Sequence, residues 1–240
     1  MTPPPLEGRG AVVTGASRGI GLATARLLAE SGARVVMLAR GAAALRAAGA
    51  EVGPSALTLA CDVGDARAVE RAIAETGRLL GAAPDIVVNN AGRFALARLE
   101  ETTTEAFTAS LDVNLVAPFR LMRAFLPAMR ERGSGHLVTI GSVADRATMP
   151  ENAAYAASKF GARALHEVLR AETRGSGVRA TLISPSAVDT PLWDPLDPDS
   201  RPDLPPRAAM LSPEDVADAV LWALTRPARA NVDELRLSRS

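Results

Sequence analysis

The sequence predicts an α/β fold: a single doubly wound parallel sheet of about seven strands, with helices on both faces. Two observations predict it. Short β-branched runs alternate with longer segments rich in Ala, Leu and Arg, which is the order of βαβ units. Several short runs are also apolar almost throughout, as expected for strands covered by helices on both sides. Because no repeat or linker divides the 240 residues, we expect one domain over 1–240. The predicted strands are Ala11–Thr14, Arg34–Leu38, Ala56–Ala60, Asp85–Val88, His136–Ile140, Arg179–Ile183 and Val232–Leu237.

The longer segments between the strands predict helices. Thr102–Glu105 and Ser212–Glu214 supply plausible caps or first turns for two of them. Pro118 and Pro127 lie inside the fourth segment, so we expect that helix to bend or break. The predicted helices lie near Ile20–Ser31, Asp65–Leu80, Thr103–Arg132, Ala154–Thr173 and Pro213–Thr225.

One long segment departs from this alternation. Eight of the 17 prolines lie between Pro185 and Pro213, after the sixth predicted strand. Long segments without regular structure are uncommon in compact domains and are usually functional or disordered. We therefore predict a lid over residues 186–211; the alternative is a disordered surface excursion.

The amino-acid composition limits the classes of partner and the cellular compartment that we expect. The 27 basic and 27 acidic residues balance, which gives no electrostatic reason to expect nucleic acid or an anionic membrane as a partner. The single cysteine, Cys61, fits a reducing compartment. The first residues lack the pattern of a signal peptide, and no uncharged apolar run is long enough to span a membrane. The expected location is the cytoplasm.

A glycine-rich turn joins the first predicted strand to the first predicted helix. Thr14–Gly21 places glycines at 15, 19 and 21, which permits a tight turn and a close approach of backbone amides to a pyrophosphate. The helix that follows points the positive end of its dipole at the phosphates. This strand–turn–helix context predicts a Rossmann-type dinucleotide site.

From this turn onward the chain resembles the short-chain dehydrogenase/reductase family, in motif order and over nearly its whole length. The turn matches TGxxxGxG, Asn89–Gly92 matches NNAG, and Tyr155–Lys159 matches YxxxK, 13 residues after Ser142. The resemblance implies an oxidoreductase that binds a nicotinamide cofactor. It implies cofactor-binding roles for Gly15, Ser17, Arg18, Gly19, Ile20, Gly21, Arg40, Asp62, Val63, Asn90, Ala91, Gly92, Tyr155, Lys159, Pro185, Val188 and Thr190, and catalytic roles for Asn114, Ser142, Tyr155 and Lys159.

The catalytic chemistry follows from the residues themselves. Tyr155 and Lys159 are four apart in a predicted helix and therefore share a face. A phenol with a pKa of about 10 is a poor base at neutral pH, but an adjacent ammonium and an oxidised nicotinamide favour the phenolate. Tyr155 then exchanges a proton with the substrate oxygen, which Ser142 orients by a hydrogen bond. The resemblance implies that Lys159 also holds the nicotinamide ribose and that Asn114 positions a water in the proton relay.

The second predicted strand ends in residues that indicate the cofactor. Ala39 stands where NAD-selective members of this fold usually have an acid, and Arg40 follows it. Arg18 lies in the glycine turn. Two guanidinium groups suit a 2′-phosphate, so the sequence predicts NADP(H).

Other residues leave the substrate open. Ser186 replaces a family glycine, which puts the local backbone in doubt. Arg93 and Arg146 could each pair with a substrate carboxylate, and Trp193 could line the pocket or anchor the lid. A small anionic substrate competes with 3-oxoacyl thioesters, ketones, aldehydes and secondary alcohols. His136 and His166 are interpreted as structural rather than as ligands, no metal is predicted, and Cys61 and Trp222 are interpreted as core.

The sequence thus predicts an NADP(H)-dependent oxidoreductase acting on a carbonyl or secondary alcohol. The alternatives are an NAD-linked alcohol dehydrogenase of the same fold and a non-catalytic NADP(H)-binding redox sensor. The predicted helices Thr103–Arg132 and Ala154–Thr173 match those that form a four-helix interface in the family, so we expect a homodimer or homotetramer. The C-terminus lacks the glycine-rich ending of many tetrameric members.

Overall fold

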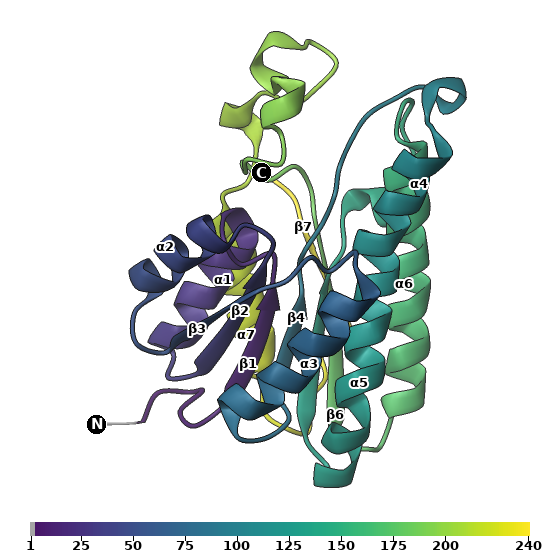
Figure 1. Ribbon diagram of the computed structural model, residues 1–240. Coiled ribbons are helices and arrows are strands. Elements are labelled where there is room, and N and C mark those ends of the chain that lie inside the picture. Colours follow the sequence, from purple (N-terminus) through teal and green to yellow (C-terminus); the bar gives the residue numbers. More distant parts are fainter. Residues whose placement is uncertain (1–2) are drawn as a thin grey trace.

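Seven parallel strands form one sheet in the order β3-β2-β1-β4-β5-β6-β7 (Figure 1). The computed structural model describes residues 3–240. The sheet confirms the predicted fold class, and all seven predicted strands are present with small shifts at their ends. Their bounds are β1 Gly10–Thr14, β2 Arg34–Ala39, β3 Ala56–Ala60, β4 Ile86–Asn89, β5 Gly135–Ile140, β6 Val178–Pro185 and β7 Glu234–Leu237.

Helices cover both faces of the sheet. Helices α1, α2 and α7 lie on one face, and α3, α5 and α6 on the other (Figure 1). Because successive residues of a strand point to opposite faces, Val12 packs in one hydrophobic cluster and Val13 in the other. The bounds are α1 Gly19–Glu30, α2 Ala42–Val52, α3 Ala66–Leu80, α4 Thr104–Leu111, α5 Ala117–Arg132, α6 Ala153–Thr173 and α7 Pro213–Leu224.

Helix α2 was not predicted. The segment Ala42–Val52 is mostly alanine, with one leucine and one glycine, so it has little apolar periodicity. The structure buries Leu45 and Ala48 against the core, and Gly49 allows close packing, because a Cβ there would lie 2.4 Å from a side-chain carbon of Thr58. Tertiary packing thus defines a helix that the pattern alone does not show.

The predicted helix Thr103–Arg132 does not break at its prolines: the chain stays helical, and a π-helical turn before Pro118 divides it. Helix α4 ends at Leu111, a π-helical turn spans Asp112–Val116, and α5 begins at Ala117. Pro118 lies in the first turn of α5, directly after this π-helical turn. Pro127 is accommodated inside α5.

The segment 186–211 projects beyond the sheet at the top of Figure 1. It contains three short 3-10 helices, Asp194–Leu196, Pro198–Ser200 and Arg207–Ala209. The guanidinium of Arg207 braces it from within, with Nη1 2.6 Å from Asp189 Oδ1 and Nη2 2.7 Å from Asp194 Oδ1. These contacts link the two ends of the segment, and its role as a lid stays a prediction. None of the helices formed by residues 3–240 has the length and apolar character needed to cross a membrane.

Predictions for three isolated side chains had different outcomes. His136 and His166 are buried, and their ring nitrogens contact the hydroxyls of Thr181 at 2.8 Å and Thr139 at 2.9 Å, as structural histidines do. The prediction that Trp222 belongs to the core is wrong. Trp222 is 47% exposed, and the guanidinium of Arg226 stacks on its ring.

Candidate active site

The glycine turn lies between the end of β1 and the start of α1. Gly15 and Gly19 have φ of +67° and +54°, the left-handed region that favours glycine. Gly21 permits a close approach, because a Cβ there would lie 2.3 Å from the Gly15 carbonyl oxygen. Arg18, at the N-cap of α1, makes no side-chain cap, and the first turn of the helix has no acidic residue. The amides at this helix start are therefore suited to a bound phosphate.

Thr14 connects this turn to the neighbouring strand. Its Oγ1 accepts hydrogen bonds from the backbone amides of Asn90 and Ala91, both at 2.9 Å. The side-chain Nδ2 of Asn90 also donates a hydrogen bond to the Thr14 carbonyl oxygen, at 2.8 Å. These contacts lie where β1 and β4 are neighbours and the strand order reverses, the place where such sheets bind nucleotides. Thr14 was absent from the predicted site residues, although it is the first letter of the glycine motif.

The predicted cofactor-binding residues line the carboxyl-terminal edge of the sheet. Arg18 and Arg40 have exposed side chains, and Ala39 is buried at the end of β2. Asp62 is exposed, its carboxylate accepting the Gly64 amide at 3.0 Å, and Val63 is buried. The other predicted residues here are Ser17 and Ile20 in the turn and Gly92 after β4.

The end of β6 brings the last predicted residues to the same edge. Pro185 ends the strand, and Val188 forms an isolated bridge with Leu211. Thr190 lies over the glycine turn, since a Cβ on Gly19 would be 3.0 Å from its methyl carbon. Ser186 does not require glycine: among residues 3–240 the only non-glycine residues with positive φ are Glu151 and Asp197.

The structure brings Ser142, Tyr155 and Lys159 together. Tyr155 and Lys159 lie one turn apart on α6, and the Lys159 ammonium is 5.6 Å from the centroid of the Tyr155 ring. Lys159 is buried, and its Nζ donates to the carbonyl oxygen of Ile140 at 2.9 Å. Ser142 caps the 3-10 turn Val143–Asp145, where its Oγ accepts the Ala144 amide at 3.1 Å. The serine proton is thereby left free to be donated elsewhere.

Burial changes the ionisation of both Tyr155 and Lys159 in the protein without cofactor. Burial raises the pKa of Tyr155 to about 12; a hydrogen bond from Ser142 lowers it, and the charge of Asp145 raises it. Burial lowers the pKa of Lys159 to about 8, against an upward effect of Asp145. The Lys159 ammonium bonds to Ile140 rather than to the phenol. The lowering of the phenol pKa beside an oxidised nicotinamide stays a prediction.

Asn114 lies in the π-helical turn and supports the loop after β4. Its Oδ1 accepts the Arg93 amide at 2.8 Å, and its Nδ2 donates to the Arg93 carbonyl at 2.9 Å and to Ser158 Oγ at 2.9 Å. The side chain is thus occupied by protein groups. Its predicted role in holding a water stays a prediction.

Phe94 and Trp193 form an aromatic wall that extends from the ring of Tyr155. Phe94 makes an edge contact with Tyr155, at 4.7 Å between ring centroids, and a second edge contact with Trp193 of segment 186–211, at 5.1 Å. Sequence reasoning missed Phe94; its place two residues after the NNAG motif was the available signal. Trp193 is thus part of this aromatic wall, and its role in lining a substrate pocket or anchoring the segment stays a prediction.

Of the two arginines proposed to meet a substrate carboxylate, Arg146 is already paired. Its Nε lies 2.8 Å from Asp145 Oδ1 and its Nη1 2.5 Å from Glu234 Oε1. Arg93 remains exposed. The prediction for Arg146 therefore fails, because two carboxylates of the protein take the place of the substrate.

Comparison with known proteins decides the family. The short chain dehydrogenase family model matches residues 9–201. The chain belongs to this family. An uncharacterized oxidoreductase of Staphylococcus aureus (strain MW2) is 33% identical over 226 residues, which cover 94% of each chain. A metagenomic short-chain oxidoreductase solved in complex with NADP is 34% identical with a TM-score of 0.84, covering 98% of this chain and 99% of that one. An alcohol dehydrogenase from the archaeon Thermococcus sibiricus, complexed with 5-hydroxy-NADP, is 33% identical with a TM-score of 0.84 over 95% of each chain.

Proposed function

We propose that this short-chain dehydrogenase uses NADP(H) to reduce a carbonyl group or oxidise the corresponding secondary alcohol, with Tyr155 as general acid and base. The observation that carries the proposal is the grouping of Ser142, Tyr155 and Lys159 at the sheet edge that also holds the glycine turn. Bound NADPH would supply the hydride. We assign the proton chemistry to these three residues.

The protonation state of Tyr155 suits the reductive direction. With a pKa of about 12, the phenol is neutral at physiological pH and holds a proton for the substrate oxygen. Ser142 donates a second hydrogen bond to that oxygen and orients it. Oxidation needs the phenolate, which the positive charge of an oxidised nicotinamide and of Lys159 would favour.

The residues at the end of β2 support NADP(H) rather than NAD(H). Ala39 presents no carboxylate to the adenosine ribose, and the exposed side chains of Arg40 and Arg18 are absent from the ion pairs formed within residues 3–240. Both guanidinium groups are thus available to a 2′-phosphate. The two structural relatives that carry NADP or 5-hydroxy-NADP support the same choice.

The aromatic wall favours a substrate with an apolar substituent. Phe94 and Trp193 give the reacting centre an apolar side, and Arg146 is engaged with protein carboxylates. Ketones, aldehydes and secondary alcohols with hydrocarbon groups fit this surface better than small hydroxy acids, for which Arg93 is the remaining anchor. We propose segment 186–211 as the lid over this substrate.

The test is NADPH consumption with a panel of ketones, aldehydes and keto acids, for the wild type and two variants. Tyr155→Phe keeps the ring and removes the proton, so turnover should fall by at least about 10²-fold while NADPH affinity changes little. Lys159→Ala should weaken both turnover and NADPH binding. Near-normal turnover in Tyr155→Phe would overturn the mechanism.

The same assay separates the alternatives. An NAD-linked alcohol dehydrogenase would show a higher kcat/KM with NADH than with NADPH. A redox sensor would bind NADPH tightly and consume none across the whole panel.

A further inference from the structure

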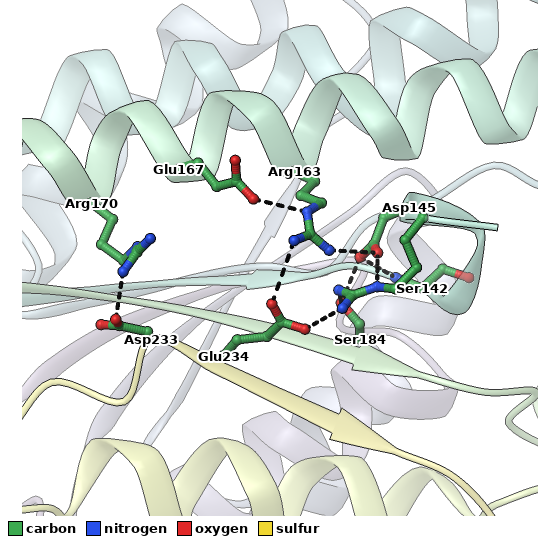
Figure 2. Close-up of polar contacts among 9 residues, drawn as sticks. Ser142, Asp145, Arg163, Glu167, Arg170, Ser184, Asp233 and Glu234 are labelled. Atoms are coloured by element: carbon green, nitrogen blue, oxygen red, sulfur yellow. Dashed lines mark hydrogen bonds and ion pairs between the residues drawn. The ribbon is translucent and has the colours of Figure 1, made fainter.

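A buried carboxylate lies directly behind the catalytic serine. The Asp145 side chain is 0% exposed, so its charge requires close partners. Oδ2 accepts from Ser184 Oγ at 2.5 Å, and Oδ1 lies 3.7 Å from Nη1 of Arg163 (Figure 2). Oδ1 also lies 2.8 Å from Nε of Arg146. Glu234 contacts both arginines, at 2.5 and 3.8 Å. Groups from α6, β6 and β7 thus hold one carboxylate in place.

That carboxylate also holds the segment that carries Ser142. Oδ2 of Asp145 accepts the backbone amide of Ser142 at 3.3 Å, and Ser142 Oγ accepts the Ala144 amide, so the two residues form a reciprocal capping box. The residue between Ile140 and Ser142 is equally confined: a Cβ on Gly141 would lie 2.5 Å from Asp145 Oδ2. The Asp145 carboxylate therefore fixes the position of the Ser142 backbone.

We propose that Asp145 is the positioning residue for Ser142, fixing the serine so that its hydroxyl points to Tyr155 and to the substrate oxygen. The arginines neutralise the carboxylate, while Ser184 and the Ser142 amide satisfy Oδ2. The effect of Asp145 on turnover rests on the proposed function. Its effect on the position of the Ser142 hydroxyl does not depend on that function.

The charge of Asp145 has a second, direct effect that the test must separate. It raises the pKa of Tyr155, whereas the hydrogen bond from Ser142 lowers it. Removing the charge therefore lowers the phenol pKa directly and raises it if Ser142 is displaced. Only the coupling between the two residues isolates the positioning role, because the direct charge effect is the same whether or not the serine hydroxyl is present.

Tyr155 is the single tyrosine of the chain, so a label on tyrosine reports on the active site alone. Difluorotyrosine, whose phenol is more acidic than that of tyrosine, can be incorporated throughout the protein and its ionisation followed by fluorine NMR. Circular dichroism at each pH checks that the fold persists. This measurement requires neither cofactor nor turnover.

The experiment is a double-mutant cycle of the wild type, Ser142→Ala, Asp145→Asn and the double variant. In the wild-type background, Ser142→Ala should raise the ionisation midpoint of the Tyr155 phenol by about half a pH unit or more, because the phenolate loses one hydrogen bond. In the Asp145→Asn background we expect less than about half of that shift. An equal shift in both backgrounds would overturn the proposal.

A matched control stands on the same side of the sheet. Asp233 pairs with Arg170 at 2.5 Å, but its side chain is 57% exposed and it has no contact with Ser142 (Figure 2). Asp233→Asn should leave the Ser142→Ala shift unchanged; a reduction as large as that in Asp145→Asn would show a general loosening and refute the specific role.

Two further arms keep the test decisive. If Asp145→Asn does not fold, Ser184→Ala removes a single hydrogen bond to the same carboxylate and should weaken the same coupling; an undiminished shift would refute the proposal. With a substrate that the wild type turns over, Asp145→Asn should lower kcat about tenfold and leave KM for NADPH unchanged. In the Ser142→Ala background the same substitution should lower kcat much less. If the wild type turns over no substrate, the proposed function fails while the NMR cycle still decides the role of Asp145.

Discussion

We predict that the proposed preference for NADP(H) can be inverted at three positions. Arg40→Ala and Arg18→Ala remove cations, and Ala39→Asp adds an acid at the end of β2, where the adenosine ribose of the proposed cofactor would lie. Both arginines are exposed, so solvent screens their attraction to a phosphate, and the lower end of the range for charged hydrogen bonds applies. About 1.4 kcal/mol for each arginine corresponds to a tenfold loss in kcat/KM with NADPH.

The same losses should be absent with NADH, which has no 2′-phosphate. Each arginine variant should change kcat/KM with NADH by less than about threefold, and the double variant should lose about 100-fold with NADPH if the two effects add. Ala39→Asp should lower activity with NADPH and raise it with NADH, because the carboxylate repels the phosphate and bonds the ribose hydroxyls. The assay is initial-rate kinetics with both cofactors and one ketone.

The matched control is Arg98→Ala, which removes an exposed arginine paired with Glu100, outside the predicted cofactor contacts. This variant should leave the ratio of kcat/KM with NADPH to kcat/KM with NADH unchanged. Equal losses with NADPH and NADH in Arg40→Ala would refute the reasoning. So would a wild type that prefers NADH.

Three other predictions concern substrate, pH and assembly. Trp193→Ala should raise KM for an apolar ketone about tenfold without changing KM for NADPH, whereas Trp222→Ala, on the exposed face of α7, should change neither; steady-state kinetics checks both. Burial lowers the pKa of His136 to about 3 and of His166 to about 4, so the unfolded chain binds more protons below its own histidine pKa of about 6.5. Thermal melts should therefore show stability falling as pH drops from about 6.5 toward 4, and a constant Tm would contradict this. Light scattering should give a dimer or tetramer of the 24.9 kDa chain, and Phe160→Arg, on the exposed face of α6, should shift it toward monomer; a wild-type monomer at micromolar concentration would defeat the prediction.

The sequence predicted the sheet because burial on both faces leaves a strong local signal. Val12 and Val13 are both fully buried, on opposite faces, and such runs cannot be confused with a half-exposed strand. Helix α2 lacked a signal of this kind, since its core contacts depend on one leucine and on alanines. The π-helical turn before Ala117 also depends on tertiary contacts, among them those made by the buried Asn114.

The site residues divide in the same way. Motif spacing predicted the grouping of Ser142, Tyr155 and Lys159, because two of them share a helix and the third follows a neighbouring strand. It could not predict that Arg146 faces Glu234, 88 residues away in sequence, since that contact requires β7 beside β6. Nor could it predict that burial raises the phenol pKa, because desolvation depends on the complete packing around the ring.

The two ends of segment 186–211 meet at its base, and this has a consequence for how such enzymes diversify. The Leu211 amide donates to the Ala187 carbonyl at 2.9 Å, and the Asp189 amide to the Leu211 carbonyl at 2.8 Å. A loop closed at its base can change length at small entropic cost, about 0.6 kcal/mol for each doubling. The segment between Ala187 and Leu211 can therefore change in length at little cost to the rest of the fold, while the sheet and helix α6, which carries Tyr155 and Lys159, keep their positions.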